Sequence, residues 1–444
     1  MTTLSPRRAA TLLAACAMLV AAGATPRAHA EARREALTLD RAIALALENQ
    51  PSLRQQAAQL EAARGRIDQA RVNRRPTITL SAAGTAGSTQ ARVINSGATV
   101  QGGFFEPFLG TGLTASASWR LYDFGQTAAS IRAAEASAAA MQASGGTTTL
   151  DIQSQVAIAY LEAVARQRLI AVADATVVSE LRHVDEARKF VAAQANDPIE
   201  VSQAVARAAT ARSTLAQAQS DAAVALANLR SAVGLFDPET TLSIDAAWPT
   251  PPADEPPPLP ALVGNARTQR PEILAFDKQI AAAEASITAA LATRRPTLTA
   301  TARSAWAPDT RDPGQAPSWT AGLTLQWQAY DGGRAAADAR VARANLVNIQ
   351  AQRDALVVTL TSQLDAARAR IIANRANVSA STEAVTAARA QLQLAEARYR
   401  QGLGSQIELA DAQFAVTSAE GNMISAEWQL ADAWAQLRRA TGRW

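Results

Sequence analysis

The sequence predicts a mainly α-helical protein with a small transmembrane β part, built from two internal structural repeats. Three observations carry this prediction. Short motifs recur 208 or 220 positions apart, which indicates a duplicated unit. Four segments of about ten residues alternate apolar and polar side chains, which is the period of a strand. Two stretches of about 65 residues are rich in Ala, Arg and Gln and predict long helices.

Residues 1–30 have the pattern of a secretory signal peptide. Two Arg precede an apolar stretch at 9–22, and the tripeptide AHA at 28–30 has the form of a cleavage site. We therefore expect the mature chain to begin at Glu31. Lipidation of Cys16 is the alternative, but the apolar run continues past that residue before the Ala-x-Ala site.

Composition excludes several classes of function. The chain has one Cys and two His, and without residues 1–30 only His183 remains of these. This excludes a disulfide framework, a Cys or His metal cluster and a Cys–His nucleophile, so we expect no metal site and no cofactor. The formal net charge of +4 falls to +1 without the three Arg of the signal, so nothing indicates a nucleic-acid partner.

We expect His183 to be a surface residue rather than a catalytic base, because charged residues surround it in the sequence. A hydrolase that uses Asp and Glu pairs is an alternative function. Such pairs, however, occur throughout solvated helices. We therefore expect that the protein is not an enzyme.

The repeats define the domain organisation. The motif RRPT at 74–77 returns at 294–297, and the Tyr-Asp pair at 122–123 returns at 330–331. The offset changes by 12 between these motifs, so we expect a longer loop in the first repeat. The assigned segments are a signal peptide at 1–30, the first repeat at 31–247, a Pro-rich linker at 248–260 and the second repeat at 261–444.

Each repeat begins with a helix that Pro76 or Pro296 ends, and two strands follow. We place these strands at about 76–86 and 111–122, and at about 296–306 and 318–330. Their length and alternation are typical of membrane strands with lipid on one side and water on the other. A half-buried strand of a soluble sandwich has the same period, but a sandwich needs many more than four strands. No segment after the signal approaches the roughly 20 apolar residues of a membrane-spanning helix.

The stretches WRLYDFGQ at 119–126 and WQAYDGGR at 327–334 mark the passage from strand to long helix. Asp caps free amides at a helix start, and Gly permits the positive φ of a sharp turn. The Trp just before them would lie in the aromatic girdle of the membrane interface. We therefore assign structural roles at this barrel–helix junction to Trp119, Asp123, Gly125, Trp327, Asp331 and Gly333.

A long helical hairpin follows each junction. We expect the long helices at 126 to about 190 and at 334 to about 400, with tips near 191–199 and 400–406. The return helices end at Gly234 and Gly442. Gly145-Gly146 predicts a frayed or kinked turn in the first long helix, because each Gly costs about 1 kcal/mol there.

The strand number predicts the oligomer. Four strands do not close a barrel, and lipid does not tolerate open strand edges. Two chains would give eight strands and an interior filled by side chains, whereas three chains give 12 strands and room for water. The simplest closed solution is a homotrimer in which a 12-stranded barrel continues into a tube of 12 helices.

The duplicated order of these elements resembles the TolC-type outer-membrane efflux channel family (outer membrane factors) over essentially the whole mature chain. The residues that carry the resemblance are the opening LTLDRAIALALENQPSL, the paired RRPT strands, the Tyr-Asp-x-Gly junctions and the turn ARYRQGLGSQIELADAQ. It implies a trimeric passive duct in the outer membrane of a Gram-negative bacterium, with a long periplasmic part. It also implies docking to a periplasmic adaptor protein and an inner-membrane transporter, in a tripartite efflux pump or a type I secretion system.

The resemblance also assigns roles at the tips. Glu408 and Asp411 match acidic residues that ring the periplasmic entrance, although the same spacing fits a solvated helix face. Tyr399 matches a tyrosine that holds the entrance shut, with Glu200 as its expected partner. Gly404 stands where the family often has a basic residue, and the first tip departs from the usual pattern at Asp197-Pro198. The residues that match the adaptor-docking turn are Gly402, Leu403 and Ser405.

A periplasmic or surface coiled-coil scaffold is the alternative function. It would explain the Ala-rich helices but not four amphipathic strands, and it would stay soluble without detergent. The choice of cargo belongs largely to the pump, which is another chain.

Overall fold

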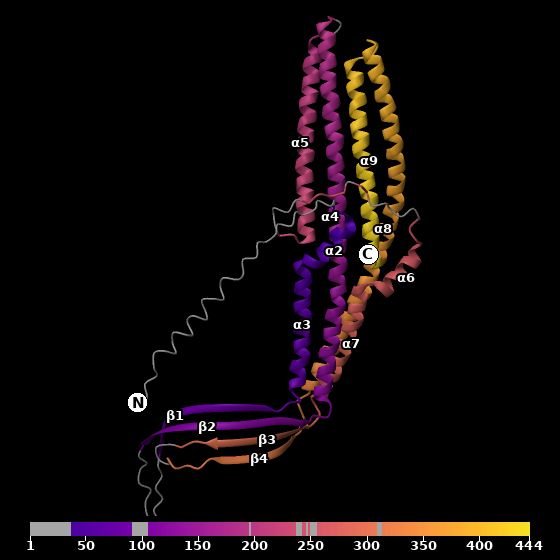
Figure 1. The fold of residues 1–444 in the computed structure, drawn as a ribbon. Coiled ribbons are helices and arrows are strands. Elements are labelled where there is room, and N and C mark those ends of the chain that lie inside the picture. The colour runs from indigo at the N-terminus through magenta and orange to yellow at the C-terminus, as the bar shows by residue number, and fades with distance from the viewer. Residues whose placement is uncertain are drawn as a thin grey trace, which may run out of the picture.

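The protein is a long helical rod with a four-stranded sheet at one end (Figure 1). The computed structural model describes residues 37–90, 105–194, 197–236, 242–245, 247–248, 255–308 and 313–444. The predicted fold class, mainly helical with a small β part, is confirmed. The expected signal peptide and Cys16 lie outside the described residues.

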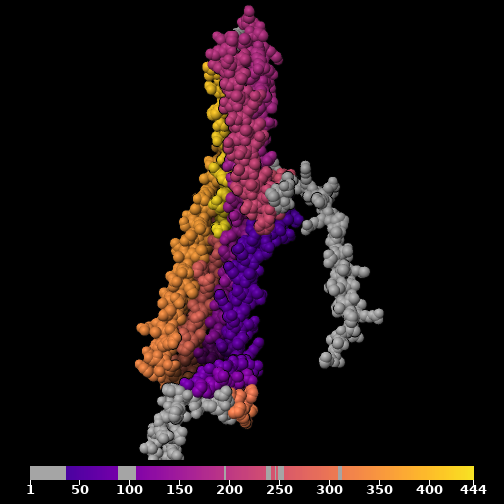
Figure 2. Space-filling model, turned by 90° about the vertical axis from the view of Figure 1, so that its left-hand side faces the viewer, coloured from indigo at the N-terminus to yellow at the C-terminus, as the bar shows by residue number. Residues whose placement is uncertain are grey.

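Both repeats have the same order of elements. In the first repeat these are α2 (Leu39–Asn49), α3 (Pro51–Val72), β1 (Thr77–Gln90), β2 (Phe105–Tyr122), α4 (Gln126–Ala192) and α5 (Ile199–Val233). In the second they are α6 (Leu259–Gln269), α7 (Pro271–Ala292), β3 (Thr297–Trp306), β4 (Ser318–Gln326), α8 (Arg334–Arg400) and α9 (Gln406–Thr441). Helices α4 and α8 have 67 residues each. The α4–α5 hairpin reaches furthest from the sheet (Figures 1 and 2).

Each return helix ends against the start of its own repeat. Gly234 and Gly442 end α5 and α9 with φ of 78° and 79°, a left-handed conformation that Gly adopts without strain. A Cβ at Gly234 would lie 3.2 Å from backbone atoms of Gln50, and one at Gly442 would lie 3.1 Å from the Cα of Arg270. Each return helix therefore ends directly against the residue that follows the short helix of its own repeat, α2 or α6.

The fraying predicted at Gly145-Gly146 is wrong, because α4 runs through both residues without interruption. The glycines serve helix packing instead. A Cβ on Gly146 would lie 2.9 Å from the Cβ of Pro271 at the start of α7. The absence of a side chain therefore lets α7 lie close to α4, and this packing offsets the poor helix propensity of Gly.

The sheet is antiparallel throughout, in the order β1-β2-β3-β4. Its register brings the apolar residues of the four strands onto one face, as in the rows Leu80–Ala115 and Leu298–Leu325. Thr and Ser residues occupy the other face, as in the row Thr299–Thr324. A register shift between Arg120 and Tyr122 places Tyr122 opposite Leu298 on the apolar face. Ile78, Leu80, Leu323 and Leu325 are each more than 60 % exposed in the single chain.

Three strand ends differ from the sequence prediction. β1 and β2 pair as far as Gln90 and Phe105, so part of the predicted long loop of the first repeat is strand. The residues added to β1 are Gly, Ser, Thr and Gln, and those added to β2 include Pro107 and the adjacent Phe108 and Leu109. Neither extension alternates apolar and polar residues, although the backbone still pairs. β4 ends at Gln326, four residues before its predicted end, because the chain there turns toward α8.

A layer of short segments packs on one side of the rod at mid-length. α2 packs on α4 and α5 in a cluster that includes Tyr160, Val164 and Leu229. The Tyr160 hydroxyl donates to the backbone oxygen of Leu37, at 3.0 Å, and Leu37 pairs with Ile244 in a short parallel bridge. A second cluster joins α6 to α8 and α9. Among the described residues, none of the helices combines the length and the apolar character needed to cross a membrane.

Candidate functional site

The strand-to-helix junctions use one arrangement in both repeats. The Asp123 carboxylate accepts hydrogen bonds from the backbone N–H of Gly125 (3.1 Å) and Thr127 (2.8 Å). The Asp331 carboxylate accepts the equivalent bonds from Gly333 (2.9 Å) and Ala335 (2.9 Å). Gly125 and Gly333 are the N-cap residues, with φ of 94° and 87°. The Asp residues therefore satisfy the free amides of α4 and α8 from two positions before the N-cap.

The hydrogen bonds lower the pKa of both carboxyl groups. Burial raises the pKa of Asp123, but hydrogen bonds from Thr127 and Gly125 outweigh this effect and hold it below its ordinary value. The backbone N–H groups of Ala335 and Gly333 lower the pKa of Asp331 in the same way. Both groups are thus ionised at neutral pH, which also suits the positive end of each helix dipole.

The junction Trp residues connect the sheet to the preceding helices. Trp119 Nε1 donates to the backbone oxygen of Arg74 (3.0 Å), just after α3, and Trp327 Nε1 donates to that of Arg294 (3.2 Å), just after α7. Both rings are otherwise exposed, by 46 % and 64 %. Each indole therefore binds the end of a helix through its polar edge and presents its apolar surface outward, as an interfacial aromatic does.

The second tip is a tight turn between α8 and α9. The backbone N–H groups of Leu403 and Gly404 both donate to the oxygen of Arg398, at 2.9 and 3.1 Å, and Gly402 has a φ of 71°. A Cβ at Gly404 would lie 3.1 Å from the backbone nitrogen of Tyr399, so a larger residue would require the turn to shift. Ser405 caps α9 through a hydrogen bond from the N–H of Glu408 to its Oγ (3.1 Å).

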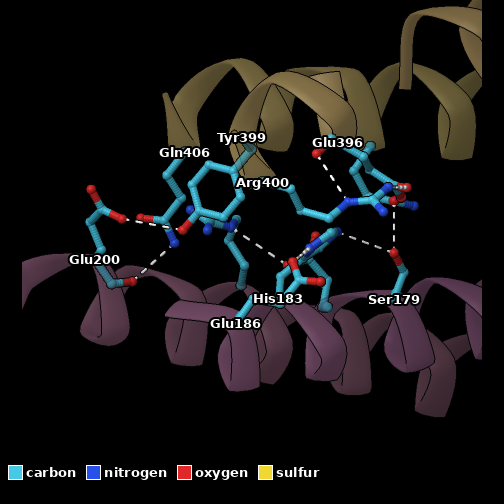
Figure 3. A network of polar contacts seen from close by, with 11 residues as sticks. Ser179, His183, Glu186, Glu200, Glu396, Tyr399, Arg400 and Gln406 are labelled. Carbon is cyan, nitrogen blue, oxygen red and sulfur yellow. Dashed lines mark hydrogen bonds and ion pairs between the residues drawn. The ribbon is translucent and has the colours of Figure 1, made fainter. Parts of the chain in front are cut away.

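Tyr399 joins this tip to the first one (Figure 3). Its hydroxyl donates to Oε2 of Glu200 in the first turn of α5 (3.3 Å), so the expected contact is present. Gln406 Nε2 donates to the backbone oxygen of Glu200 (3.0 Å). The Tyr399 ring is 4 % exposed and packs edge-on against Phe190 of α4, with ring centroids 5.4 Å apart. The second hairpin is therefore held against both helices of the first.

The two predicted entrance acids have different surroundings. Glu408 Oε1 lies 3.5 Å from Nε of Arg398, and both side chains are partly exposed. Asp411, one turn further along α9, is exposed. Arg398 thus offsets the charge of Glu408, in a pair that the sequence did not predict. The predicted hairpin could have revealed this pair. Arg398 and Glu408 stand five residues before and after Leu403, and antiparallel helices bring such positions together.

His183 is not a surface residue, and that prediction is wrong. Its side chain is 6 % exposed, with Nε2 3.3 Å from Ser179 Oγ and Nδ1 3.6 Å from Glu186 (Figure 3). Ser179 in turn donates to Oε1 of Gln413 on α9 (2.9 Å). Of the charged neighbours in sequence, Glu186 lies on the same face of α4 as His183, whereas Asp185 points to another face, since positions two apart on a helix do not share a face.

The first tip is less regular. Asp197 accepts a hydrogen bond from the N–H of Ile199 (2.9 Å) and so supports the start of α5 after Pro198. Residues 195–196 lie outside the described part of the chain. In the part that is described, no three His, Cys, Asp or Glu side chains are placed to hold a metal ion.

Known proteins share this architecture. The chain is 29 % identical to protein CyaE of Bordetella pertussis over 385 residues, which are 86 % of this chain and 79 % of CyaE. It is 25 % identical over 324 residues to the outer membrane efflux protein BepC of Brucella suis, with 70 % of this chain and 69 % of BepC covered. The fold matches the Campylobacter jejuni CmeC outer membrane channel with a TM-score of 0.76 over 91 % of this chain and 85 % of CmeC, at 16 % identity.

The sequence profile of the outer membrane efflux protein family matches residues 42–235 and 262–443, one match for each repeat. These matches cover most of the described helices and strands. The resemblance to TolC-type channels found in the sequence is confirmed. The chain therefore belongs to the outer membrane efflux protein family, and it is a channel protein of the outer membrane rather than an enzyme.

Proposed function

We propose that three copies of the chain close into one duct that crosses the outer membrane and the periplasm and serves as the passive exit of a tripartite pump. The observation that carries this proposal is the sheet. Among the described residues, the edge strands β1 and β4 each pair with one neighbouring strand only. One face of the sheet is apolar along all four strands. Lipid does not tolerate such edges, and pairing β1 of one copy with β4 of the next removes them.

The number of chains in the duct follows from the space that the closed barrel must enclose. Three sheets give 12 strands, which leave an aqueous channel, whereas eight strands leave an interior filled with side chains. The polar face of Thr and Ser then lines the water, and the apolar face meets lipid. Helices α4 and α8, at 1.5 Å per residue, extend about 100 Å from the sheet, which suits a tunnel through the periplasm.

The tip is the proposed docking and gating site. Leu403 and Ile407 are about 70 % exposed there, beside Gly402 and Ser405, and they offer an apolar contact to an adaptor protein. An inner-membrane transporter would then supply cargo through that adaptor. The contact of Tyr399 with Glu200 holds the second hairpin inward, so its loss would widen the entrance. Asp411 and the partly neutralised Glu408 would give that entrance a preference for cations.

The test is to extract the full chain from membranes in mild detergent and to measure its mass and its length by electron microscopy. A trimer whose length is well over the roughly 100 Å of one long helix is the expected result. The same preparation should form conducting channels in planar lipid bilayers. A soluble monomer or dimer without conductance would overturn the duct and favour the coiled-coil scaffold.

A further inference from the structure

Phe414 is the most exposed large apolar side chain of α9, although it lies inside that helix and not in the tip turn. Its side chain is 75 % exposed in the single chain. It borders two grooves, one between α4, α5 and α9 and the other between α8 and α9. Helix α9 lies between α4 and α8 (Figure 1), so Phe414 stands on the ridge that separates the two grooves.

This face of α9 points away from the layer of short segments. Glu427 marks the opposite face, because the indole of Trp248, in the segment between the repeats, donates a hydrogen bond to its carboxylate. Phe414 stands 13 residues before Glu427, which is about 140° around the helix. A closed tube of helices has room for an additional layer only on its outer surface. Phe414 then faces the lumen of the proposed duct.

Helix α8 gives the same orientation. Its residues in the α8–α9 groove include Ala380 and Ala387, which stand nine and 16 residues after Ile371. Ile371 is buried in the cluster that joins α6, a member of the outer layer, to α8 and α9. The two groove residues lie about 180° and 160° around α8 from Ile371. Both helices thus turn the groove beside Phe414 away from the outer layer.

Phe414 differs in kind from the rest of this face. Between Asp411 and Gln429, all of which the structure describes, it is the one large apolar side chain at about 140° to 180° from Glu427. The other residues at these angles are polar, namely Asp411, Ser418, Asn422, Ser425 and Gln429. Polar residues suit a wall in contact with water. A phenyl ring on such a wall leaves its apolar surface in water unless it meets other apolar surface.

Three chains would bring three Phe414 rings to one level of the lumen. Asp411, one of the acids proposed to line the entrance, stands three residues closer to the tip, about 4.5 Å along the helix. A phenyl ring reaches further from the helix than a carboxylate does. Where three Asp411 side chains narrow the entrance, three rings narrow the lumen at least as much. An apolar constriction of this kind loses its water and opposes the passage of ions.

We propose that Phe414 of the three chains forms an apolar constriction just inside the acidic entrance and limits the passage of hydrated ions through the duct. The inference rests on the duct proposed above. A hydrated ion passes an apolar ring only by giving up water, which is costly, whereas the apolar part of a solute gains contact with the rings. The constriction would therefore oppose small ions and still admit amphiphilic cargo.

The first test compares the single-channel conductance of full-length trimers in planar lipid bilayers with KCl on both sides. Phe414→Gln, with a polar side chain of similar length, should raise the conductance about threefold, because water then fills the constriction. Phe414→Leu keeps an apolar side chain and should stay close to the native conductance. Neither change disturbs the packing of a side chain that is 75 % exposed. No rise in Phe414→Gln, or an equal rise in both variants, would overturn the inference.

The second test asks whether position 414 faces the lumen. A positively charged methanethiosulfonate reagent adds a bulky group to a thiol, and it should lower the conductance of Phe414→Cys trimers. The native protein, whose single Cys is Cys16, is the control for the reagent. The matched control variant is Asp185→Cys, at an exposed position of α4. Asp185 stands 25 residues after Tyr160, about 20° around α4, on the side where α2 packs.

The reagent should leave Asp185→Cys and the native protein unchanged. An unchanged conductance of treated Phe414→Cys would overturn the lumenal position, and with it the constriction, while leaving the duct intact. Absent conductance in the native protein and in every variant would overturn the duct itself.

Discussion

Tyr399 and Glu200 join the end of α8 to the start of α5 through one hydrogen bond of 3.3 Å. The backbone oxygen of Glu200 also accepts from Gln406, so one residue of α5 binds both helices of the second hairpin. A typical hydrogen bond contributes about 1 kcal/mol net. These bonds join the two hairpins at the tip, and the partner docking proposed above would release more free energy than bonds of this size cost to break.

Tyr399→Phe should open the tip. The variant removes the hydroxyl that donates to Glu200 but keeps the ring that packs on Phe190. We therefore expect a larger conductance in planar bilayers, with a loss of only about 1 kcal/mol in folding stability. The control is Tyr330→Phe, at a residue that is 85 % exposed near the sheet. Equal conductance of Tyr399→Phe and the native protein would mean that this contact does not limit the entrance.

Asp411→Asn should lower cation selectivity more than Glu408→Gln does. Arg398 lies 3.5 Å from Glu408 and already offsets its charge, whereas Asp411 is exposed. The measurement is the reversal potential across a bilayer with a KCl gradient. Asp185→Asn, on an exposed position of α4, serves as the control for loss of one charge elsewhere. The assignment of an acidic ring fails if Asp411→Asn and the double variant Glu408→Gln/Asp411→Asn both keep the native reversal potential.

Leu323→Arg should block membrane insertion. Leu323 pairs with Ala300 on the apolar face of the sheet, and an Arg facing lipid costs about 2 to 4 kcal/mol at the membrane midplane. Thr324→Arg is the matched control, because Thr324 pairs with Thr299 on the polar face. Fractionation of outer membranes should find Thr324→Arg inserted and Leu323→Arg depleted. The reverse distribution would mean that the two faces are assigned the wrong way round.

The sequence best predicted the helices, helix starts and helix ends that occur in both repeats. The long helices, the Asp–Gly junctions and the Gly234 and Gly442 ends appear in both repeats, so each copy supports the other. Strand length was missed in β1 and β2, because backbone pairing needs no apolar alternation. His183 was missed because neighbours in sequence say little about which helix face meets α9.

Gly146→Ala should destabilise the protein, although Ala is the better helix former. The new Cβ would lie 2.9 Å from the Cβ of Pro271 and push α7 away from α4, and such overpacking costs about 1 to 3 kcal/mol. Gly65→Ala is the control, since Gly65 lies in α3 with open space around it. There the substitution should stabilise the helix by up to about 1 kcal/mol. Thermal unfolding should therefore shift in opposite directions, and a gain from Gly146→Ala would contradict the close α4–α7 contact.

Removing the Asp331 carboxylate should lower stability at neutral pH but not in acid. Hydrogen bonds from Ala335 and Gly333 lower the pKa of this group below its ordinary value of about 3.9. A carboxyl group with a lowered folded-state pKa stabilises the fold fully above its unfolded pKa, and this contribution is lost as pH falls through the folded pKa. Asp331→Ala should therefore unfold at a lower temperature than the native protein at pH 7, and the difference should shrink as the pH falls below about 4. Asp338→Ala is the control, because Asp338 makes only a 3.9 Å surface ion pair with Arg334 and should have little effect at either pH. If the difference in unfolding temperature between Asp331→Ala and the native protein stays constant down to pH 3, the side chain of Asp331 supports the start of α8 without its charge.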